Sequence, residues 1–291
     1  LDIFASRART REGKIQVELA QLRYRAVRLV GLRNSLSRLG GGIGTRGPGE
    51  KKLEVDRRLI HERISQLKSE LEDVKRHREV VRKKRENGGA LTAAIVGYTN
   101  AGKSTLLNRL TQAGILAEDK LFATLDPTTR ALTLPGGERV LLTDTVGFIR
   151  KLPHHLIEAF KSTLEEAKYS DVILHVVDCS NPQMDMQMHV VYETLRQLEI
   201  TDKEIVTVFN KIDREGADTA GRDMAADYRV KISAKTGEGL PDLLGVLETI
   251  LRSRRIYFEK VFSYAEAGRI QRIRKNGRLL SEEYKEDGIH V

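Results

Sequence analysis

The stretch GYTNAGKS, residues 97–104, is the most informative segment of this chain. The apolar run LTAAIVG leads into it and predicts a buried strand, and STLLNRLTQAG after it has the composition of a helix. Glycine, four residues, glycine, lysine and serine between a strand and a helix are typical of a P-loop, whose backbone N–H groups point at phosphates. Gly97 and Gly102 would let the chain wrap, Lys103 would reach the β/γ-phosphate oxygens, and the Ser104 hydroxyl would ligate Mg²⁺.

Two later segments supply further contacts to the metal and the γ-phosphate. VLLTDTVG, residues 140–147, is an apolar strand that ends in Asp144, which is placed to hold magnesium through water. Gly147 is free to offer its backbone N–H to a γ-phosphate. LFATLDPTTR, residues 121–130, is expected to form switch I, whose threonine completes the Mg²⁺ shell only when a γ-phosphate is present. The candidates are Thr124, favoured by its position in FATLD, and Thr128 and Thr129, since spacing alone does not settle the choice.

The contacts to the base are predicted at the ends of two more strands. EIVTVFNKID, residues 204–213, ends in Asn210, Lys211 and Asp213. A carboxylate at Asp213 can accept hydrogen bonds from both N1–H and the exocyclic amine of guanine, and adenine offers no such pair of donors. YRVKISAKTGEGL, residues 228–240, repeats the pattern of a strand followed by a loop with Ser233, Ala234 and Lys235, where a backbone N–H near Ala234 is expected to meet the guanine O6. The site is therefore predicted to select guanine.

The residue after Gly147 bears on the rate of hydrolysis. Ras-like enzymes carry a glutamine there that orients the attacking water, whereas this chain has Phe148. Hydrolysis is expected to be slow until another group or a partner positions the water. His154 and His155 lie nearby, and we interpret them as exposed structural histidines.

The first 90 residues predict an antiparallel helical hairpin with a glycine-rich tip. Two runs of apolar or small residues follow the 4-3 spacing of a heptad seam, and the segment between them, residues 40–49, is too poor in helix formers to continue either helix. The first run comprises Ile15, Leu19, Leu22, Ala26, Leu29 and Leu36, and the second comprises Ile60, Ile64, Leu67, Leu71, Val74 and Val81. The tip contains a formal G-x-G-x-x-G at Gly42, Gly44 and Gly47, but a dinucleotide site would need a strand before its first glycine. We therefore expect the tip to approach RNA, with five basic candidate contacts, Arg46, Lys51, Lys52, Arg57 and Arg58.

Charge and composition support a polyanionic partner. The net charge of +9 is divided unevenly, with +11 in residues 1–90, −6 in residues 91–251 and +4 in residues 252–291. Basic flanks of this size suit nucleic acid, because neutralising phosphates releases counterions. No apolar run is long enough to cross a bilayer and no secretory signal is visible, so a cytoplasmic location is expected. The single cysteine, Cys179, ends an apolar run and is expected to be buried.

Together these segments resemble the HflX family of ribosome-associated GTPases over nearly the whole chain. The glycine-rich tip combined with FATLDPTTR is more specific for this family than the nucleotide motifs alone. The resemblance implies an α/β fold: a P-loop GTPase domain with a mixed, mostly parallel sheet at residues 91–252, preceded by a helical hairpin at residues 1–90 and followed by a small α/β module at residues 253–291. It also implies Mg²⁺-dependent hydrolysis of GTP to GDP and phosphate, stimulated by ribosomes, and binding of the large ribosomal subunit and its RNA in splitting or rescue of stalled ribosomes. We expect a monomer.

By the same resemblance, the nucleotide site is assigned residue by residue. Lys103, Thr124 and Gly147 are the catalytic candidates, and Ser104 and Thr124 hold Mg²⁺ directly, with Asp144 acting through water. The full set of nucleotide contacts is Gly97, Tyr98, Thr99, Asn100, Ala101, Gly102, Lys103, Ser104, Thr105, Phe122, Ala123, Thr124, Leu125, Asp126, Asp144, Thr145, Val146, Gly147, Asn210, Lys211, Ile212, Asp213, Ser233, Ala234 and Lys235.

Two other functions remain open on the sequence. The chain could be an RNA-remodelling ATPase with a second nucleotide site in the N-terminal region, or a GTPase scaffold that binds a protein through the hairpin. Family members usually carry a longer N-terminal α/β domain, so truncation at this end is expected, and the C-terminal module is expected to lack its closing strand.

Overall fold

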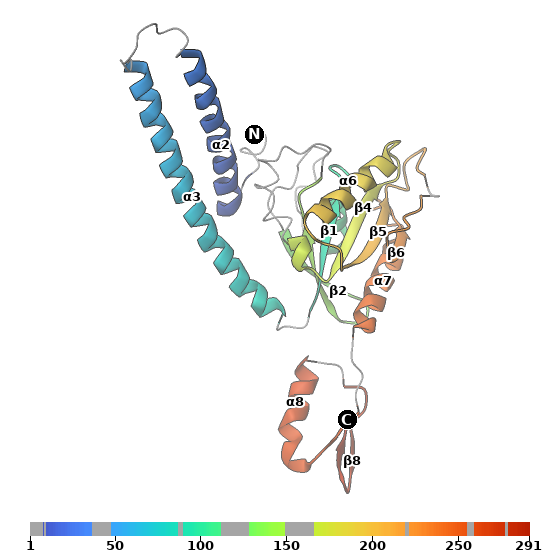
Figure 1. The fold of residues 1–291 in the computed structure, drawn as a ribbon. Helices are drawn as coiled ribbons and strands as arrows, with labels where there is room; N and C mark the ends of the chain where they lie inside the picture. The colour runs from blue at the N-terminus through green and yellow to red at the C-terminus, as the bar shows by residue number, and fades with distance from the viewer. Residues whose placement is uncertain are drawn as a thin grey trace.

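The computed structural model describes most of the 291-residue chain. The described residues are Ala8, 10–36, 48–86, 90–111, 128–148, 166–218, 221–254, 259–276 and 279–291, and the side chains of residues 29–53, 81–86 and 275–276 are not among them. Figure 1 shows three parts: a pair of long helices, a central sheet flanked by helices, and a small module at the C-terminal end. No helix within these ranges combines the length and apolar character that a bilayer crossing requires.

The central sheet has six strands, of which five are parallel. Its order is β2-β3-β1-β4-β5-β6, and only β2 runs antiparallel to its neighbour. The strands are β1 (Leu91–Gly97), β2 (Thr128–Thr133), β3 (Arg139–Asp144), β4 (Val172–Asp178), β5 (Glu204–Asn210) and β6 (Tyr228–Lys231). The apolar runs form strands because helices cover both faces, and all seven residues of β4 are buried. The predicted mixed, mostly parallel sheet is confirmed.

The pairing of the parallel strands places their carboxyl ends at one edge. Gly97 pairs with Val176, Ile95 pairs with Asp144, and Asp178 pairs with Asn210. Ligands of open parallel sheets bind at this edge, where the loops leave the strands. The motif residues at the ends of β1, β3 and β5 are therefore neighbours in space.

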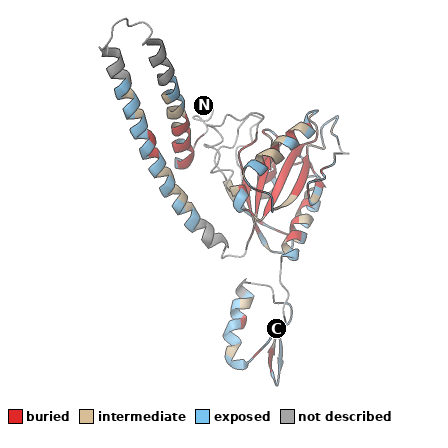
Figure 2. Ribbon diagram, in the orientation of Figure 1, coloured by how far each residue is buried: buried red, intermediate tan, exposed pale blue. Residues whose placement is uncertain are grey.

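Helices cover the two faces of the sheet and form two hydrophobic cores. Helices α4 (Lys103–Thr111) and α7 (Leu240–Ser253) cover one face, and Leu106, Leu107, Leu243 and Leu247 are buried there. On the other face lies α6 (Met184–Gln197), which contributes Val191 and Leu195. Figure 2 shows the buried residues concentrated in the strands between these layers.

The N-terminal helices form the predicted antiparallel pair. They are α2 (Arg11–Leu36) and α3 (Pro48–Glu86), and α3 therefore begins inside the segment that the sequence assigned to the tip. Proline suits a first helical turn, where its missing N–H is not needed. Buried seam residues join the helices: Ile15, Leu19, Ile64 and Leu67, with Leu22, Ile60 and Leu71 partly buried beside them. Ion pairs between Glu18 and Arg63 and between Arg11 and Glu70 flank this seam.

The base of the hairpin packs on the central domain through a second apolar face. Val17 and Ala20 of α2 share a core with Val146 and Phe148, which follow β3, and with Ala167. The seam pattern did not reveal this face, because its residues lie between the seam positions.

A cluster of charged side chains closes the same junction. Arg78 of α3 forms ion pairs with Glu12 of α2 and with Glu166, in the helical turn at residues 166–169. The distance from Arg78 Nε to Glu166 Oε1 is 3.7 Å, and all three side chains are largely buried. Residues from α2, α3 and the central domain therefore meet at one guanidinium group.

The C-terminal module is a three-stranded sheet with one helix. Its elements are β7 (Val261–Phe262), the 3₁₀ turn η1 (Tyr264–Glu266), α8 (Ala267–Asn276), β8 (Glu283–Lys285) and β9 (Gly288–His290), and the strand order is β7-β9-β8. Phe262, Ile270 and Ile289 form its small core. The predicted combination of helix and strands is present in this part of the chain.

Candidate functional site

The loop after β1 has the wrapped backbone that its sequence predicts. Gly102 has a φ of +98°, and a Cβ atom there would lie 2.3 Å from Asn210 Nδ2. A Cβ atom on Gly97 would lie 2.3 Å from the carbonyl oxygen of Val176 in β4. Asn100 also adopts a positive φ, of 64°, which asparagine tolerates better than most residues. Both glycines are thus required, because neighbouring strands and side chains press against the loop.

Lys103, the first residue of α4, folds back across this loop. Its ammonium donates hydrogen bonds to the carbonyl oxygens of Gly97, at 3.2 Å, and of Tyr98, at 3.0 Å. Burial lowers the pKa of Lys103 to about 8, a shift that nearby Asp144 opposes and Lys211 reinforces. A buried cation whose hydrogen bonds go to carbonyl groups is a favourable site for an anion.

Ser104 and Asp144 lie together beside this lysine. The Ser104 hydroxyl donates a 2.7 Å hydrogen bond to Asp144 Oδ2, and Asp144 is fully buried at the end of β3. The next residue, Thr145, donates its hydroxyl to the carbonyl oxygen of Ile95 and so fixes the chain as it leaves the strand. The two predicted metal-site residues of the described chain are therefore in direct contact.

The segment from Gly147 to Phe148 passes close to the phosphate loop. A Cβ atom on Gly147 would lie 2.8 Å from Thr99 Cα and 3.1 Å from Lys103 Nζ, so only glycine allows this approach. The Phe148 amide donates to the carbonyl oxygen of Gly97, and its own carbonyl accepts from Thr99. The Phe148 side chain is buried in the core shared with α2, where it cannot orient a water molecule.

Asn210 at the end of β5 joins the two halves of the site. Its Nδ2 donates to the Ala101 carbonyl in the phosphate loop at 2.9 Å, and its Oδ1 accepts from the Ala234 amide at 2.9 Å. Its side chain therefore fixes the spacing between phosphate loop and base loop. The Ala234 N–H already donates to Asn210 Oδ1, so a neighbouring amide in the same loop is the better candidate donor to guanine O6.

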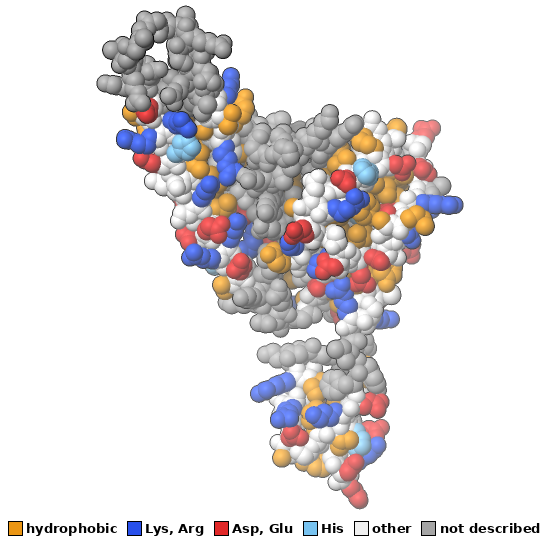
Figure 3. Space-filling view, in the orientation of Figure 1, with side chains coloured by type: hydrophobic (Ala, Val, Ile, Leu, Met, Phe, Trp, Pro, Cys, Tyr) orange, Lys and Arg blue, Asp and Glu red, His pale blue; other side chains and the backbone are white. Residues whose placement is uncertain are grey.

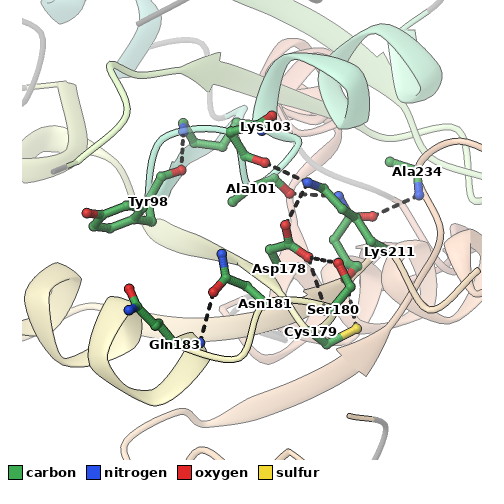
Figure 4. A network of polar contacts seen from close by, with 12 residues as sticks. Tyr98, Ala101, Lys103, Asp178, Cys179, Ser180, Asn181, Gln183, Lys211 and Ala234 are labelled. Carbon is green, nitrogen blue, oxygen red and sulfur yellow. Dashed lines mark hydrogen bonds and ion pairs between the residues drawn. The ribbon is translucent and has the colours of Figure 1, made fainter. Parts of the chain in front are cut away.

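Asp178 at the end of β4 is a site residue that sequence reasoning missed. It lies between two motif strands, and its Oδ2 accepts a 2.7 Å hydrogen bond from Lys211 Nζ, which also donates to the Asn100 carbonyl oxygen. Its Oδ1 accepts from the amide and the hydroxyl of Ser180. Figure 4 shows Asp178 between Lys211 and Ser180, below the phosphate loop. Its position as an acidic residue at the end of an apolar strand was the sequence feature that could have identified it.

Asp213 stands at the exposed end of the site. Its Oδ1 accepts a 2.7 Å hydrogen bond from the Ser233 hydroxyl, and this bond holds the pKa of Asp213 below its usual range. The Ser233 hydroxyl in turn accepts from the Thr236 amide. The carboxylate is thus ionised and oriented by the loop that follows β6, as a base-recognising group requires.

The remaining predicted residues are divided between the described and undescribed parts of the chain. Phe122 to Asp126, including Thr124, lie outside the described residues, as do Arg46, His154, His155 and the side chains of Lys51 and Lys52. Of the alternative threonines, Thr129 pairs its hydroxyl with that of Thr143 at 2.9 Å within the sheet. Arg57 and Arg58 are exposed on α3. Cys179 is buried as predicted and donates its thiol to the Asn210 carbonyl.

The geometry thus assembles groups for a nucleotide at one edge of the sheet. Backbone amides, a buried lysine and a hydroxyl–carboxylate pair surround the start of α4, and an oriented carboxylate stands beside the loop after β6. Such a set can bind a polyphosphate with a divalent cation and can discriminate among purine bases.

Comparison with known proteins assigns relatives to both halves of the chain. A family model described as "GTP-binding GTPase Middle Region" matches residues 7–85, and one described as "50S ribosome-binding GTPase" matches residues 92–211. The curated protein GTPase HflX of Lacrimispora saccharolytica is 77% identical over the whole chain, which spans 69% of that protein. GTPase HflX of Caldanaerobacter subterraneus is 52% identical over the whole chain, which spans 67% of its length.

A more distant relative and a solved structure agree with these matches. GTPase HflX of Escherichia coli K12 is 48% identical over 85% of the chain and 59% of its own length. A crystal structure of a GTP-binding protein from the archaeon Sulfolobus solfataricus in complex with GDP is 26% identical, with a TM-score of 0.57 over 87% of this chain and 71% of that one.

Proposed function

This chain belongs to the HflX family of GTPases, and from that premise we propose that it is a GTP-controlled factor that binds the large ribosomal subunit and acts in splitting or rescue of stalled ribosomes. As a member of this family it hydrolyses GTP to GDP and phosphate. Two features of the chain support ribosome binding: a guanine nucleotide site, and a hairpin whose far half is basic and exposes some apolar side chains.

We assign the phosphate half of the site to the loop from Gly97 to Ser104. Its amides and Lys103 would hold the β- and γ-phosphates, and the adjacent Ser104 hydroxyl and Asp144 carboxylate are the oxygen groups that Mg²⁺ prefers. The donor set therefore fits a magnesium ion, which when bound neutralises charge on the phosphate oxygens. Thr124 remains our candidate for a further metal ligand.

We assign the base half of the site to Asp213 and the loop that carries Ser233, Ala234 and Lys235. The Ser233 hydroxyl orients Asp213 toward the N1–H and amine edge of guanine. Asn210 and Lys211 tie this half to the phosphate loop through Ala101 and Asn100. We also assign Ile212, which follows β5, and Thr145 and Val146, which follow β3, to the nucleotide site as backbone neighbours of these side chains.

Hydrolysis in this arrangement depends on a group from outside the described site. Phe148 turns its ring into the core, so the position that carries a water-orienting glutamine in Ras-like enzymes contributes only backbone here. Lys103 stabilises developing charge, and Gly147 offers its amide next to it. We propose that hydrolysis is slow in the isolated protein and accelerates on the ribosome.

The hairpin supports an RNA partner through its charge distribution. Residues 23–58, toward the end far from the sheet, hold 10 Lys and Arg against 3 Asp and Glu, whereas residues 10–22 and 59–86 hold 11 against 8. Near the sheet the charges are paired between the helices, as in Glu18–Arg63. Figure 3 shows Lys and Arg side chains along the described hairpin surface. The excess of Lys and Arg over Asp and Glu is therefore 7 in residues 23–58 and 3 in the rest of the hairpin, and we propose that the far half contacts phosphates.

Apolar and aromatic groups accompany the arginines in that half. Tyr24 is 48% exposed and carries the Arg28 guanidinium over its ring at 5.6 Å, and Val27 is 72% exposed. Aromatic rings beside guanidinium groups suit the bases of single-stranded or looped RNA, which can stack on them.

Sedimentation of the protein with purified large ribosomal subunits tests the proposal. We expect tight binding with a non-hydrolysable GTP analogue, weaker binding with GDP, and a steep loss of affinity as salt rises, because phosphate contacts release counterions. GTP turnover should increase when the subunits are added. Equal affinity in both nucleotide states, or binding that ignores ionic strength, would contradict the proposal and favour a protein-binding scaffold.

A matched pair of variants locates the RNA contact. Arg57→Gln with Arg58→Gln removes two charges from the far half, and Lys68→Gln with Arg76→Gln removes two exposed charges from the near half. We expect the first pair alone to reduce the slope of log affinity against log salt, by roughly one to two. Turnover without ribosomes should be unchanged in both.

A further inference from the structure

We infer that Arg109, in the last turn of α4, is a positioning residue for the guanine-binding loop and thereby sets part of the selectivity for guanine. The inference rests on the proposed assignment of the nucleotide site. Neither the P-loop motif nor the base-binding motifs include this residue.

Arg109 links α4 to a residue that lies 127 positions later in the sequence. Its Nη2 donates a 3.0 Å hydrogen bond to the Thr236 carbonyl oxygen, in the loop between β6 and α7. The helix that carries Arg109 starts at Lys103 and Ser104, so its first turn belongs to the phosphate half of the site. At nine residues, α4 is about 13 Å long, and it spans the distance between the phosphate loop and Arg109.

The loop that receives this bond has a tightly determined backbone. Gly237 and Gly239 have φ values of +96° and +72°, and the Gly237 amide donates to the Ser233 carbonyl oxygen at 2.8 Å. A Cβ atom on Gly237 would lie 2.9 Å from Arg109 Nη2, so the guanidinium rests directly against the backbone there. The glycine at this position thus leaves the space that the arginine occupies.

The same loop is held on its other side by the residues that recognise the base. Ser233 donates its hydroxyl to Asp213, and the Ala234 amide donates to Asn210. The segment expected to meet guanine O6, around Ala234 and Lys235, therefore lies between these bonds and the Arg109 contact at Thr236. Without Arg109 the loop would lose the hydrogen bond that joins Thr236 to α4. The backbone amides around Ala234 and Lys235 would then be less well placed to donate to guanine O6.

The expected consequence is specific to the base. Loss of Arg109 should weaken the contact with O6, while the contacts of the phosphates with Lys103 and Ser104 remain. Affinity should therefore fall for GDP but not for a diphosphate with the same sugar and phosphates and no O6 acceptor. A general destabilisation of the site would weaken both ligands alike.

We would measure the affinities of GDP and of 2-aminopurine riboside diphosphate, which lacks O6 and N1–H but keeps the exocyclic amine, the sugar and the phosphates, for the wild-type chain, Arg109→Ala and Arg196→Ala. Arg196 is an exposed arginine on α6 that pairs with Glu193 and serves as the matched control. We expect Arg109→Ala to weaken GDP about fivefold, a typical effect of one hydrogen bond, with little change for the analogue and none in the control.

Two outcomes overturn the inference: an equal loss for both ligands, or a loss for GDP no larger than that of Arg196→Ala. Failure of the wild-type chain to bind GDP would instead contradict the proposed nucleotide site. Thermal unfolding of each variant checks that the exposed substitutions leave the fold intact.

Discussion

Lys103 is buried and donates its hydrogen bonds to carbonyl oxygens, so its protonation should respond to the nucleotide. Burial lowers its pKa to about 8, so in the nucleotide-free protein it loses its proton as the pH rises through this value. Bound phosphates favour the ammonium form, so binding above pH 8 requires proton uptake. We predict that GDP affinity falls as the pH is raised from 7 to 8.5, with uptake of roughly three quarters of a proton at pH 8.5.

Calorimetry in buffers of different ionisation enthalpy measures that uptake. Lys103→Arg is the control, because arginine stays charged at every pH used. Uptake that persists unchanged in this variant would show that another group is responsible.

Asp178 is predicted to matter for both stability and nucleotide binding. Asp178→Asn removes the charge that pairs with the largely buried Lys211 ammonium and weakens the acceptor for Ser180. We expect the free energy of unfolding to fall by about 2 kcal/mol and the GDP affinity to fall several-fold, because Lys211 also contacts the phosphate loop. Asp202→Asn, at an exposed loop position, should change neither in urea unfolding and equilibrium binding.

Sequence reasoning at this scale identified residues whose roles follow from a local pattern. Gly97, Gly102 and Asn210 occupy the positions that their motifs predict, because each motif combines a strand end with its own loop. Asp178 and Arg109 were missed because their partners lie 33 and 127 residues away, and only the assembled sheet and helices bring them into contact.

At the scale of elements, the three-way junction at Arg78 should fix how the hairpin meets the central domain. Arg78→Ala would leave Glu12 and Glu166 largely buried without their common cation. We predict a loss of about 3 kcal/mol in the free energy of unfolding, measured in urea, since breaking one side of a buried ion pair leaves an uncompensated charge. Faster hydrogen exchange in residues 10–20 should accompany it.

The matched control is Arg76→Ala, two residues earlier on the exposed side of α3. Arg76 lies 3.9 Å from Asp73, and both side chains are mostly exposed, so its removal should change stability by no more than about 0.5 kcal/mol. Equal effects of the two substitutions would show that the junction contributes nothing beyond an ordinary surface pair.

The elements differ in how well the sequence predicted them. The heptad spacing identified the seam residues Ile15, Leu19, Ile64 and Leu67, because each helix buries them against the other. It did not reveal the packing of Val17 and Ala20 on the central domain, since a single periodicity describes one face and this helix has two. The start of α3 at Pro48 was also unexpected, because the glycines on both sides of Pro48 are poor helix formers, although proline itself suits a first helical turn.

At the scale of the whole molecule, a buried histidine at the centre of the sheet should make the fold sensitive to acid. His175 of β4 lies 3.9 Å from Asp223, which accepts hydrogen bonds from Tyr192 and Thr207. Burial lowers the pKa of His175 to about 4, with Asp223 opposing the shift and Lys103 adding to it. In the unfolded chain the pKa of this histidine is near 6.5, so the unfolded state takes up the proton first as the pH falls. The contribution of neutral His175 to the free energy of unfolding is therefore complete above pH 6.5 and is lost as the pH falls toward 4.

The size of the effect is about 3 kcal/mol, from the difference between the two pKa values. Urea unfolding of the wild type and of His175→Gln between pH 7 and 4 measures it, and the slope should be shallower in the variant. His189→Gln, at an exposed position on α6, should keep the wild-type slope. Parallel slopes in all three proteins would exclude His175 as the source.

The three-part organisation was visible in the sequence as changes of charge and pattern. The six-stranded sheet and its helices run from Leu91 to Ser253, whereas the exact limits 1–90, 91–252 and 253–291 stay predictions. Composition cannot give the docking of the hairpin, because Val146 and Phe148 reveal their partners in α2 only when the chain is folded.

The attachment of the hairpin next to Val146 and Phe148 has a mechanical consequence. The hairpin is held on the central domain where Val17 and Ala20 of α2 pack on Val146 and Phe148, and the Phe148 backbone forms hydrogen bonds with the phosphate loop. From Ala20 to its last residue, Leu36, α2 extends about 24 Å. A tilt of about 10° at that pivot would sweep the far end of α2 through about 4 Å, more than the length of a hydrogen bond. A tilt of the hairpin that is too small to break a contact near the nucleotide would therefore be large enough to make or break whole contacts at the far end of the hairpin.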